Sequence, residues 1–411
     1  MNRIKLLLAP IVVLLPSAVF AADPPAASDI PTPKFERQVI DAKIQIGYGI
    51  AIGDVDGDGK PDILLADKKQ IVWYRNPDWK RFVMAEDLTP QDNVCIAARD
   101  IDGSGKVSVA VGAGWNPNET TDPSKSGAVF YLIRPADPTQ RWQPVRLHHE
   151  VTTHRMQWVH AGPGKTDFQL VVVPLHGLGN KDGKGNGVRI MAYERPENPH
   201  DEWKTHVISD TMHMTHNFDL RWDESMGSEE GLIAGREGIG SFSRVLDTWT
   251  SAPPEAMPGM KDGAGEVRFC SLGESFGWAT IEPMHGNKVV FYPASGIGEK
   301  QKRVSLDDTL SQGHGLACAD LLGLKRWQVV AGWRAPNKDK KVGIKLYVPL
   351  DNKGEKWETH LIDDNQMACE DLKIADLDAD GRPDIVAAGR ATHNLVIYWN
   401  RTKQQSSATA K

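Results

Sequence analysis

The sequence lacks the patterns that mark several common classes of protein. Its four cysteines form no C-x-x-C pair and no Cys/His finger spacing, which excludes a zinc-finger protein. It has no G-x-S-x-G nucleophile elbow, no P-loop, and no G-x-G-x-x-G in a dinucleotide-binding context. A net charge of −6 provides no concentrated basic surface. We therefore expect no nucleic-acid partner.

Long apolar runs are also missing, apart from one short stretch at the start of the chain. Residues 6–19 are apolar, follow Arg3 and Lys5, and precede the small residue Ala21. This pattern predicts a secretory signal over residues 1–21. The alternative, a membrane anchor, is disfavoured because the stretch contains two prolines and is shorter than the roughly 20 residues that span a bilayer. We expect an exported protein, periplasmic or extracellular, with no membrane span in its mature form.

The rest of the chain is predicted to form one domain over residues 35–401. Residues 22–34 are rich in Ala and Pro and are expected to be a disordered lead-in, and residues 402–411 a disordered tail. An oxidising compartment would permit disulfides, and four cysteines allow three pairings between which the sequence does not choose. Four buried free thiols are the alternative. The cysteines are Cys95, Cys270, Cys318 and Cys369.

Three kinds of segment recur along this domain. The first places an acidic turn between two strands and occurs at 50–66, 96–114 and 372–389, with a degraded copy at 316–333. The second is a strand with an aromatic residue near its end, at 71–77, 128–135, 189–196, 288–293, 344–349 and 395–400. The third opens with Trp and alternates in polarity, at 79–87, 142–150, 203–210 and 357–364, with a variant lacking Trp at 302–308. Each unit is thus a meander of four short strands.

The repeat predicts an all-β fold, a seven-bladed β-propeller of four-stranded antiparallel blades. The units number seven at about 52 residues each, with six or eight as the alternatives. The last unit ends at 396–401 without its Trp-type strand, whereas a matching strand, 35–43, stands ahead of the first unit. Pairing the N-terminal strand with the last blade would close the circle and remove both exposed sheet edges.

Two of the acidic turns fit the pattern D-x-D-x-D-G-x-x-D. Carboxylates at alternate positions of a tight loop converge on one point and suit a hard cation that takes six to eight oxygen ligands, Ca²⁺ above all. The alternative is an Asx-rich turn without a metal. The predicted ligands are Asp54, Asp56, Asp58 and Asp62 in the first unit and Asp376, Asp378, Asp380 and Asp384 in the last. The second unit keeps only Asp100 and Asp102, so we interpret the ions as structural. These turns resemble those of the FG-GAP/VCBS repeat family, which implies a calcium-stabilised propeller.

The repeat also predicts that candidate functional residues collect on the face opposite the acidic turns. In a meander, the start of strand one and the end of strand two lie on the same face. The strand starts supply Tyr48, His154, His216, Glu266, His314 and Glu370. The ends of the second strands supply Trp115, His176, Arg236, His285, Arg334, Arg390 and His393.

These side chains suggest both a metal site and catalysis. His154, His216, His314 and Glu370 would hold a divalent transition metal such as Zn²⁺ near the axis. Arginines bind oxyanions, and Tyr48 or a free histidine can move a proton. Trp115 can stack on a sugar, with His176 and Arg236 binding substrate nearby. The alternative is ordinary channel histidines and arginines that bond backbone carbonyls.

A closer resemblance appears in the runs 281–287, 312–321, 329–334 and 376–400, which are similar to the propeller domain of aldos-2-ulose dehydratase-like proteins. The resemblance implies a metal-assisted lyase that eliminates water from a keto-sugar such as 1,5-anhydrofructose. It implies an axial site of His154, His216, His314 and Glu370, with His285, Arg334, Arg390 and His393 around the substrate. The cupin-like domain of the fungal enzyme has no counterpart here, so no isomerase step is implied.

The sequence therefore predicts a metal-assisted carbohydrate lyase, a carbon–oxygen lyase of the sugar dehydratase type. The alternative is a non-catalytic propeller that binds glycans or a protein partner. An enzyme concentrates its titratable groups on the axis, whereas a binding propeller shows exposed aromatic and acidic rims around a quiet channel.

Overall fold

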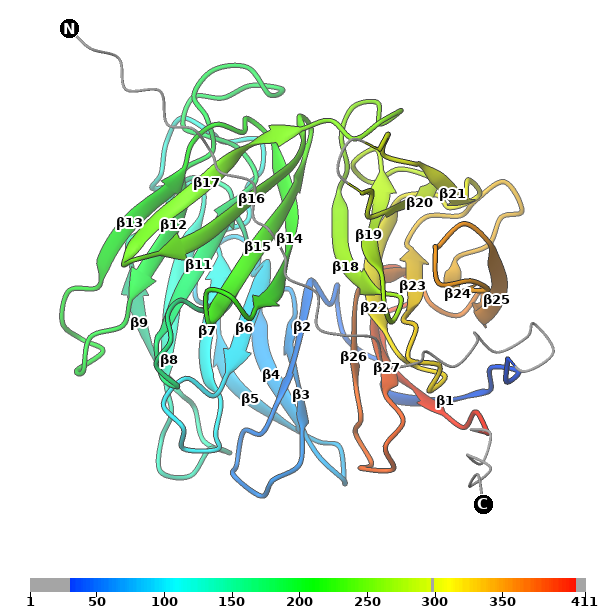
Figure 1. Ribbon diagram of the computed structural model, residues 1–411. Coiled ribbons are helices and arrows are strands. Elements are labelled where there is room, and N and C mark those ends of the chain that lie inside the picture. Colours follow the sequence, from blue (N-terminus) through cyan, green and yellow to red (C-terminus); the bar gives the residue numbers. More distant parts are fainter. Residues whose placement is uncertain (1–29, 297–298, 404–411) are drawn as a thin grey trace, which may run out of the picture. The chain divides into compact units, whose positions relative to one another are not determined.

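The computed structural model describes residues 30–296 and 299–403, and these form strands without helices (Figure 1). The predicted signal segment, 1–21, lies outside the described residues, as do most of the predicted lead-in and tail. Within the described ranges, no helical segment meets the length and hydropathy needed to cross a bilayer. All four cysteines are free thiols, and only Cys318 is more than marginally accessible.

Within these described ranges, twenty-eight strands make seven four-stranded antiparallel sheets, as the repeat predicts. Blade 1 contains β2 (Gly49–Gly53), β3 (Asp62–Ala66), β4 (Gln70–Arg75) and β5 (Lys80–Glu86). Blade 2 contains β6 (Cys95–Arg99), β7 (Ser108–Ala113), β8 (Ala128–Ile133) and β9 (Gln143–Leu147). Blade 3 contains β10 (Thr153–His160), β11 (Phe168–Pro174), β12 (Ile190–Glu194) and β13 (Lys204–Ser209). Blade 4 contains β14 (Thr215–Asp223), β15 (Ser228–Gly235), β16 (Gly238–Val245) and β17 (Thr248–Glu255).

The remaining three blades follow the same order. Blade 5 contains β18 (Glu266–Ser271), β19 (Phe276–Glu282), β20 (Lys288–Pro293) and β21 (Val304–Asp307). Blade 6 contains β22 (Gly313–Ala319), β23 (Gln328–Trp333), β24 (Gly343–Pro349) and β25 (Trp357–Asp364). Blade 7 contains β26 (Cys369–Ala375), β27 (Asp384–Gly389), β28 (Asn394–Asn400) and the N-terminal strand β1 (Phe35–Asp41). The prediction of a seven-bladed propeller is confirmed.

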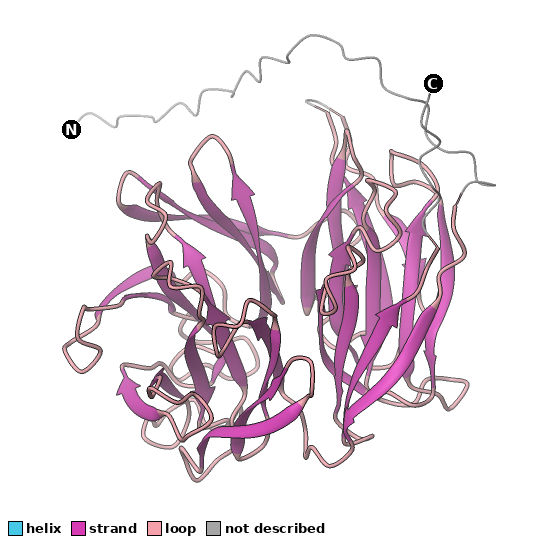
Figure 2. Cartoon of the chain, turned by 90° about the horizontal axis from the view of Figure 1, so that it is seen from below, coloured by secondary structure: helices cyan, strands magenta, loops and turns pink. Residues whose placement is uncertain are grey.

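The first strands of the blades surround a common axis. Each contacts the first strand of the next blade, from β2 through β6, β10, β14, β18 and β22 to β26, and β26 contacts β2. The seven sheets formed by residues 31–403 are therefore arranged around this axis and face one another across it (Figure 2). Buried clusters fill the spaces between neighbouring blades, such as Trp73 of blade 1 with Ile96 and Val109 of blade 2. The strand periodicity puts these side chains there, because alternate residues of each strand face the adjacent sheet.

β1 pairs antiparallel with β28, in a register that runs from Phe35 opposite Asn400 to Val39 opposite Val396. The outer edge of blade 7 is therefore formed by residues more than 350 positions away in the sequence. The backbone N–H of Arg401 also donates to the carbonyl oxygen of Lys34, at 2.8 Å.

Two buried asparagines join blades 1, 7 and 6 on the side of the acidic turns. Asn76 Nδ2 donates to the carbonyl oxygen of Leu377 at 2.7 Å, and Asn400 Nδ2 donates to that of Leu321, also at 2.7 Å. Asn400 is fully buried and also donates to the Pro383 carbonyl oxygen, at 3.1 Å. Each asparagine thus satisfies carbonyl oxygens in its own blade and the preceding one.

We predict that Asn400→Ala lowers the free energy of unfolding by about 2–3 kcal/mol, because it leaves two carbonyl oxygens unsatisfied near the blade 6–7 junction. Urea denaturation measures the change. Asn118→Ala, at an exposed position, is the matched control and should change stability by less than about 0.5 kcal/mol. Equal effects of the two substitutions would contradict the role given to Asn400.

Candidate functional site

Four blades carry a bulge at the start of their first strand. The register of β10, β14, β22 and β26 shifts against the second strand at this point, whereas β2, β6 and β18 pair regularly there. The residues left out of the pairing are His154, His216 with Asn217, His314 and Glu370. A bulge frees a side chain from the alternation of the strand and re-aims it. At these bulges, the four predicted axial residues fall outside the regular alternation of side chains along their strands.

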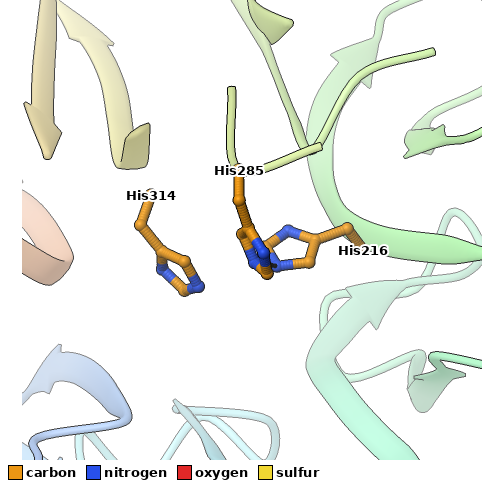
Figure 3. Close-up of side chains that lie close together, drawn as sticks. All are labelled: His216, His285 and His314. Carbon is orange, nitrogen blue, oxygen red and sulfur yellow. Dashed lines mark hydrogen bonds between the residues drawn. The ribbon is translucent and has the colours of Figure 1, made fainter. Parts of the chain in front are cut away.

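Three histidines from three blades converge. Each of His216, His285 and His314 offers a ring nitrogen within 4.8 Å of those of the other two. Figure 3 shows these three side chains gathered together. Ring centroids are 4.5 Å apart for His216 and His285, and 5.0 Å apart for each of the other two pairs. The Nε2 atoms of His216 and His285 are 2.8 Å apart. We call these three residues the histidine trio.

Backbone carbonyls fix which ring nitrogen of the strand-start histidines carries the proton. His216 Nδ1 lies 2.8 Å from the carbonyl oxygen of Gly265, and His314 Nδ1 is hydrogen-bonded to that of Glu370. His154 Nδ1 lies 2.8 Å from the carbonyl oxygen of His216. Because a carbonyl oxygen only accepts, each Nδ1 must donate, and each Nε2 keeps its lone pair. This arrangement of a histidine oriented through its second nitrogen is typical of metal ligands.

His285 reaches the trio from a turn. It follows β19 and adopts φ of 52°, in the left-handed region that non-glycine residues seldom occupy. The turn is closed by the Gly286 N–H, which donates to the Pro283 carbonyl oxygen at 2.7 Å. Such a conformation costs energy, and outliers of this kind cluster at functional sites.

The imidazoles are held neutral. Burial, the neighbouring His216 and the charge of Arg334 lower the pKa of His285 to about 2. Burial is also the main cause that lowers the pKa of His154, His216 and His314. Neutral imidazole is the form that coordinates a metal ion, so the trio needs no deprotonation to bind one.

Glu370 is engaged by two arginines. Arg334 Nη1 donates to both of its carboxylate oxygens, at 2.9 and 3.1 Å, and Arg390 Nη1 donates to Oε1 at 2.9 Å. Arg334 Nε also donates to Gln312 Oε1, at 3.1 Å. The carboxylate therefore neutralises and orients two guanidiniums. The group whose ligand atoms all lie within 4.8 Å of one another joins His285 to His216 and His314, and it includes neither Glu370 nor His154.

Tyr48 and His154 flank this arrangement. The Tyr48 hydroxyl donates to Asp92 Oδ2 at 3.1 Å, and Arg390 lies over its ring, with Cζ 5.4 Å from the centroid. Burial and the charge of Asp92 raise the pKa of Tyr48 far above its usual value, so the phenol stays protonated. The His154 ring stacks on Trp115, with centroids 4.9 Å apart, and its centroid lies 4.7 Å from that of His216.

The other predicted residues lie in the loops of this face. His393 is exposed, and its Nδ1–H donates to the Gln45 carbonyl oxygen at 2.8 Å, which leaves Nε2 free. Arg236 is exposed and donates to the Asp182 carbonyl oxygen at 2.5 Å. His176 is half-buried, and within the described part of the chain its Nδ1 has no hydrogen-bond partner.

The acidic turns lie at the opposite ends of the same strands, since Gly53 pairs with Asp62 and Gly49 with Ala66. Carboxylate oxygens within 4.8 Å of one another come from Asp54, Asp56 and Asp58 in blade 1 and from Asp376, Asp378 and Asp384 in blade 7. Asp62 accepts the N–H groups of Val55 and Asn76, both at 2.8 Å, and so fastens the turn. Asp380 is paired with Arg382 and Arg401.

The buried carboxylates of these turns resist ionisation. Burial raises the pKa of Asp62 to about 7 and that of Asp384 to about 6, with the neighbouring aspartates adding to the effect. A cation in the turn would remove this penalty.

Two family models match parts of the chain. The family model described as the aldos-2-ulose dehydratase β-propeller domain matches residues 126–295, a range that includes His216 and His285. The propeller is related to that of aldos-2-ulose dehydratase. An FG-GAP-like repeat model matches residues 54–111, which hold the acidic turns of blades 1 and 2. Both matches confirm the resemblances stated from the sequence.

More distant likenesses, to solved structures, show the fold alone. A chain in the crystal structure of the mitotic checkpoint complex aligns with a TM-score of 0.55 and 12% identity, covering 95% of this chain and 100% of the other. A chain in the crystal structure of BBS1N in complex with ARL6DN, soaked with lead, aligns with a TM-score of 0.53 and 12% identity, covering 92% and 98%. No curated protein sequence matches the chain.

The depressed histidine pKa values predict acid sensitivity. A histidine in the unfolded chain takes up a proton near pH 6.5, whereas His285 in the folded protein does so only near pH 2. Because the unfolded state then binds more protons than the folded state, the free energy of unfolding falls as the pH drops below 6.5. Each such histidine adds a slope of about 1.4 kcal/mol per pH unit. In metal-free protein, His285→Asn should therefore lose about 2 kcal/mol less stability than the parent between pH 7 and pH 5. Urea denaturation at both pH values measures this, and equal losses would contradict it. Asn is chosen because it tolerates the left-handed conformation.

Proposed function

We propose that the chain is a metal-assisted carbohydrate lyase that eliminates water from keto-sugars. The observation that carries the proposal is the histidine trio, three neutral imidazoles from three blades whose nitrogens lie within 4.8 Å of one another. The relation to the aldos-2-ulose dehydratase propeller supports it. The left-handed conformation of His285, which places its ring against those of His216 and His314, also supports it.

The donor set fits a divalent transition metal. Three imidazole nitrogens are ligands that suit Zn²⁺, and catalytic zinc sites use three protein ligands with one position left for water or substrate. His216, His285 and His314 would hold the ion, with His216 and His314 oriented by backbone carbonyls. The bound ion would supply a Lewis acid for the ketone oxygen of the sugar.

The surrounding side chains provide the remaining chemistry. β-Elimination needs a group that accepts the proton next to the ketone and a group that protonates the departing hydroxyl. His393 presents a free Nε2 and is the proposed acceptor, and Tyr48, held protonated, is the proposed donor. Arg390, with 41% of its side chain exposed, would bind the negative charge that develops on the substrate. Arg334 is half-buried, is paired with Glu370, and would keep this carboxylate in place.

The test is turnover by zinc-loaded protein. Incubation with 1,5-anhydrofructose should produce the ultraviolet absorbance of a conjugated enone, and His314→Ala should reduce the rate at least about 100-fold because it removes a ligand of the ion. His200→Gln, at an exposed position outside the site, is the control and should keep the parent rate. Metal analysis after dialysis should find about one zinc per chain in the parent and none in His314→Ala.

Absence of enone together with absence of a transition metal would overturn the proposal. Glycan binding without turnover would then favour the non-catalytic propeller.

We further propose that the acidic turns of blades 1 and 7 bind structural Ca²⁺. Each turn gathers three carboxylates. Backbone N–H groups fix the conformation of the turn, such as that of Gly59, which donates to Asp54 Oδ2 at 2.8 Å. The sequence of residues 1–21 supports export, which would supply extracellular calcium concentrations.

Calcium should stabilise the protein by about 2.7 kcal/mol at a concentration 100 times its dissociation constant. Asp54→Asn and Asp376→Asn should each reduce the increase in melting temperature that Ca²⁺ produces. Asp100→Asn in the equivalent turn of blade 2, where three carboxylates do not converge, is the control and should leave the increase unchanged. An increase of the same size in all three variants would contradict the assignment.

A further inference from the structure

Besides the channel of about 770 Å³ that the first strands line along the axis, the described residues line a second cavity, of about 650 Å³. It lies where the ring closes, between blade 7 and blade 1. Residues of β1 and β28 line it, together with the acidic turns of blades 1 and 7 and the turn between β4 and β5. We call it the closure cavity. Because the acidic turns lie at the strand ends opposite the histidine trio, the closure cavity opens on the other face of the propeller.

Two tryptophans line the closure cavity. Trp79, in the turn between β4 and β5, is half-buried, and Trp399 on β28 is 9% exposed. Their ring centroids are 6.2 Å apart, and the ring planes are tilted by 51°. The two indoles therefore meet at an angle and give the cavity an aromatic wall. A cavity of this size holds a ligand of a few rings.

Trp79 differs from the tryptophans at the start of the fourth strands of other blades. Trp142 and Trp203 are buried, and each donates its indole N–H to the carbonyl oxygen of the proline four residues earlier, at 3.1 Å. Trp357 donates its indole N–H to the carbonyl oxygen three residues earlier, at 2.8 Å. In these three blades the indole N–H is thus satisfied within the turn that carries it.

In blade 1 the backbone takes the place of the indole. The carbonyl oxygen of Arg75, four residues before Trp79, accepts the backbone N–H of Trp79 at 2.6 Å, and Trp79 adopts φ of 53°, in the left-handed region. Among residues 30–296 and 299–403, no protein group accepts the indole N–H of Trp79. The turn therefore presents an aromatic ring with an unused donor at the cavity.

The charged residues that line the closure cavity are all paired. Each of the three cations lies within 4.0 Å of a carboxylate: Arg37 near Asp363, Lys60 near Asp58, and Arg401 near Asp378. The remaining lining carboxylate, Glu36, lies 3.8 Å from Arg401. Because these charges are balanced, the cavity favours a neutral polar ligand over an ion.

The rim of the closure cavity offers both donors and acceptors of hydrogen bonds. The side chain of Lys60 is 52% exposed and that of Glu36 is 71% exposed. Gln38 is exposed, and its Oε1 accepts the indole N–H of Trp399 at 2.7 Å, which leaves its amide nitrogen as a donor. An aromatic wall beside such a rim suits a molecule that has an apolar face and hydroxyl groups.

We propose that the closure cavity binds a neutral glycan, with a pyranose ring packed against the indole of Trp79. The C–H groups of the sugar face contact the indole, and its hydroxyl groups pair with the Trp79 N–H, Lys60 and Glu36. A proline-rich peptide also packs on tryptophan, but proline has no N–H to donate to Glu36. This inference goes beyond the proposed function, because it concerns the opposite face of the propeller and needs no metal at the trio.

The experiment is calorimetric titration of the full chain with three neutral hexasaccharides, cellohexaose, maltohexaose and laminarihexaose, and with decaproline. At least one hexasaccharide should bind with a dissociation constant of about 1 mM or lower, and decaproline should not bind. Trp79→Phe should weaken this binding at least about threefold, because it removes the donor, and Trp79→Ala at least about tenfold, because it removes the ring as well. Trp357→Phe is the matched control and should bind as the parent does, since its indole N–H is bonded within its own turn.

Failure of all three hexasaccharides to bind overturns the inference, as does binding that Trp79→Ala leaves unchanged. Decaproline bound as tightly as any hexasaccharide would assign the cavity to a peptide and would also overturn it. If Trp79→Ala does not fold, Lys60→Trp replaces it, because a bulky side chain from this exposed position fills the cavity and should weaken binding to the same extent. Enone formation without hexasaccharide binding refutes this inference alone, and the reverse result refutes the proposed lyase alone.

Discussion

The contact between the first strands of neighbouring blades is the constraint on which the site depends. Because these strands contact one another in a continuous series from β2 to β26 and back to β2, the start of every first strand lies at one end of the same channel. Residues as distant in sequence as Tyr48 and Glu370 are therefore brought near one another. No single blade can build the trio, since its members come from three.

The bulges bring candidate functional side chains to the strand starts. Regular pairing would keep His154, His216 and His314 in the alternation of their strands, whereas the register shifts release them and the backbone carbonyls fix their tautomers. Blades without a bulge place Tyr48 and Glu266 at the corresponding positions, where each is hydrogen-bonded to a neighbouring polar side chain. The opposite ends of the same strands bear the acidic turns, so the candidate cation sites and the candidate chemistry occupy separate faces.

Much of this was predictable from the sequence, because it follows from repetition. The seven blades, the acidic turns, and the placement of His216 and His314 all come from the register of a repeat. The sequence does not reveal the bulges or the left-handed turn at His285, since no residue type marks them. It also does not show that Glu370 is occupied by Arg334 and Arg390. This pairing depends on which side chains neighbouring blades present, and a repeat pattern does not encode it.

The central claim is that three blades deliver three neutral imidazoles to one ion. A crystal structure of the zinc-soaked protein, with anomalous data collected on both sides of the zinc absorption edge, tests this most directly. The account predicts one strong anomalous peak about 2.0–2.1 Å from a ring nitrogen of each of His216, His285 and His314. A map with no peak there, or with zinc bound only at the acidic turns, would contradict it.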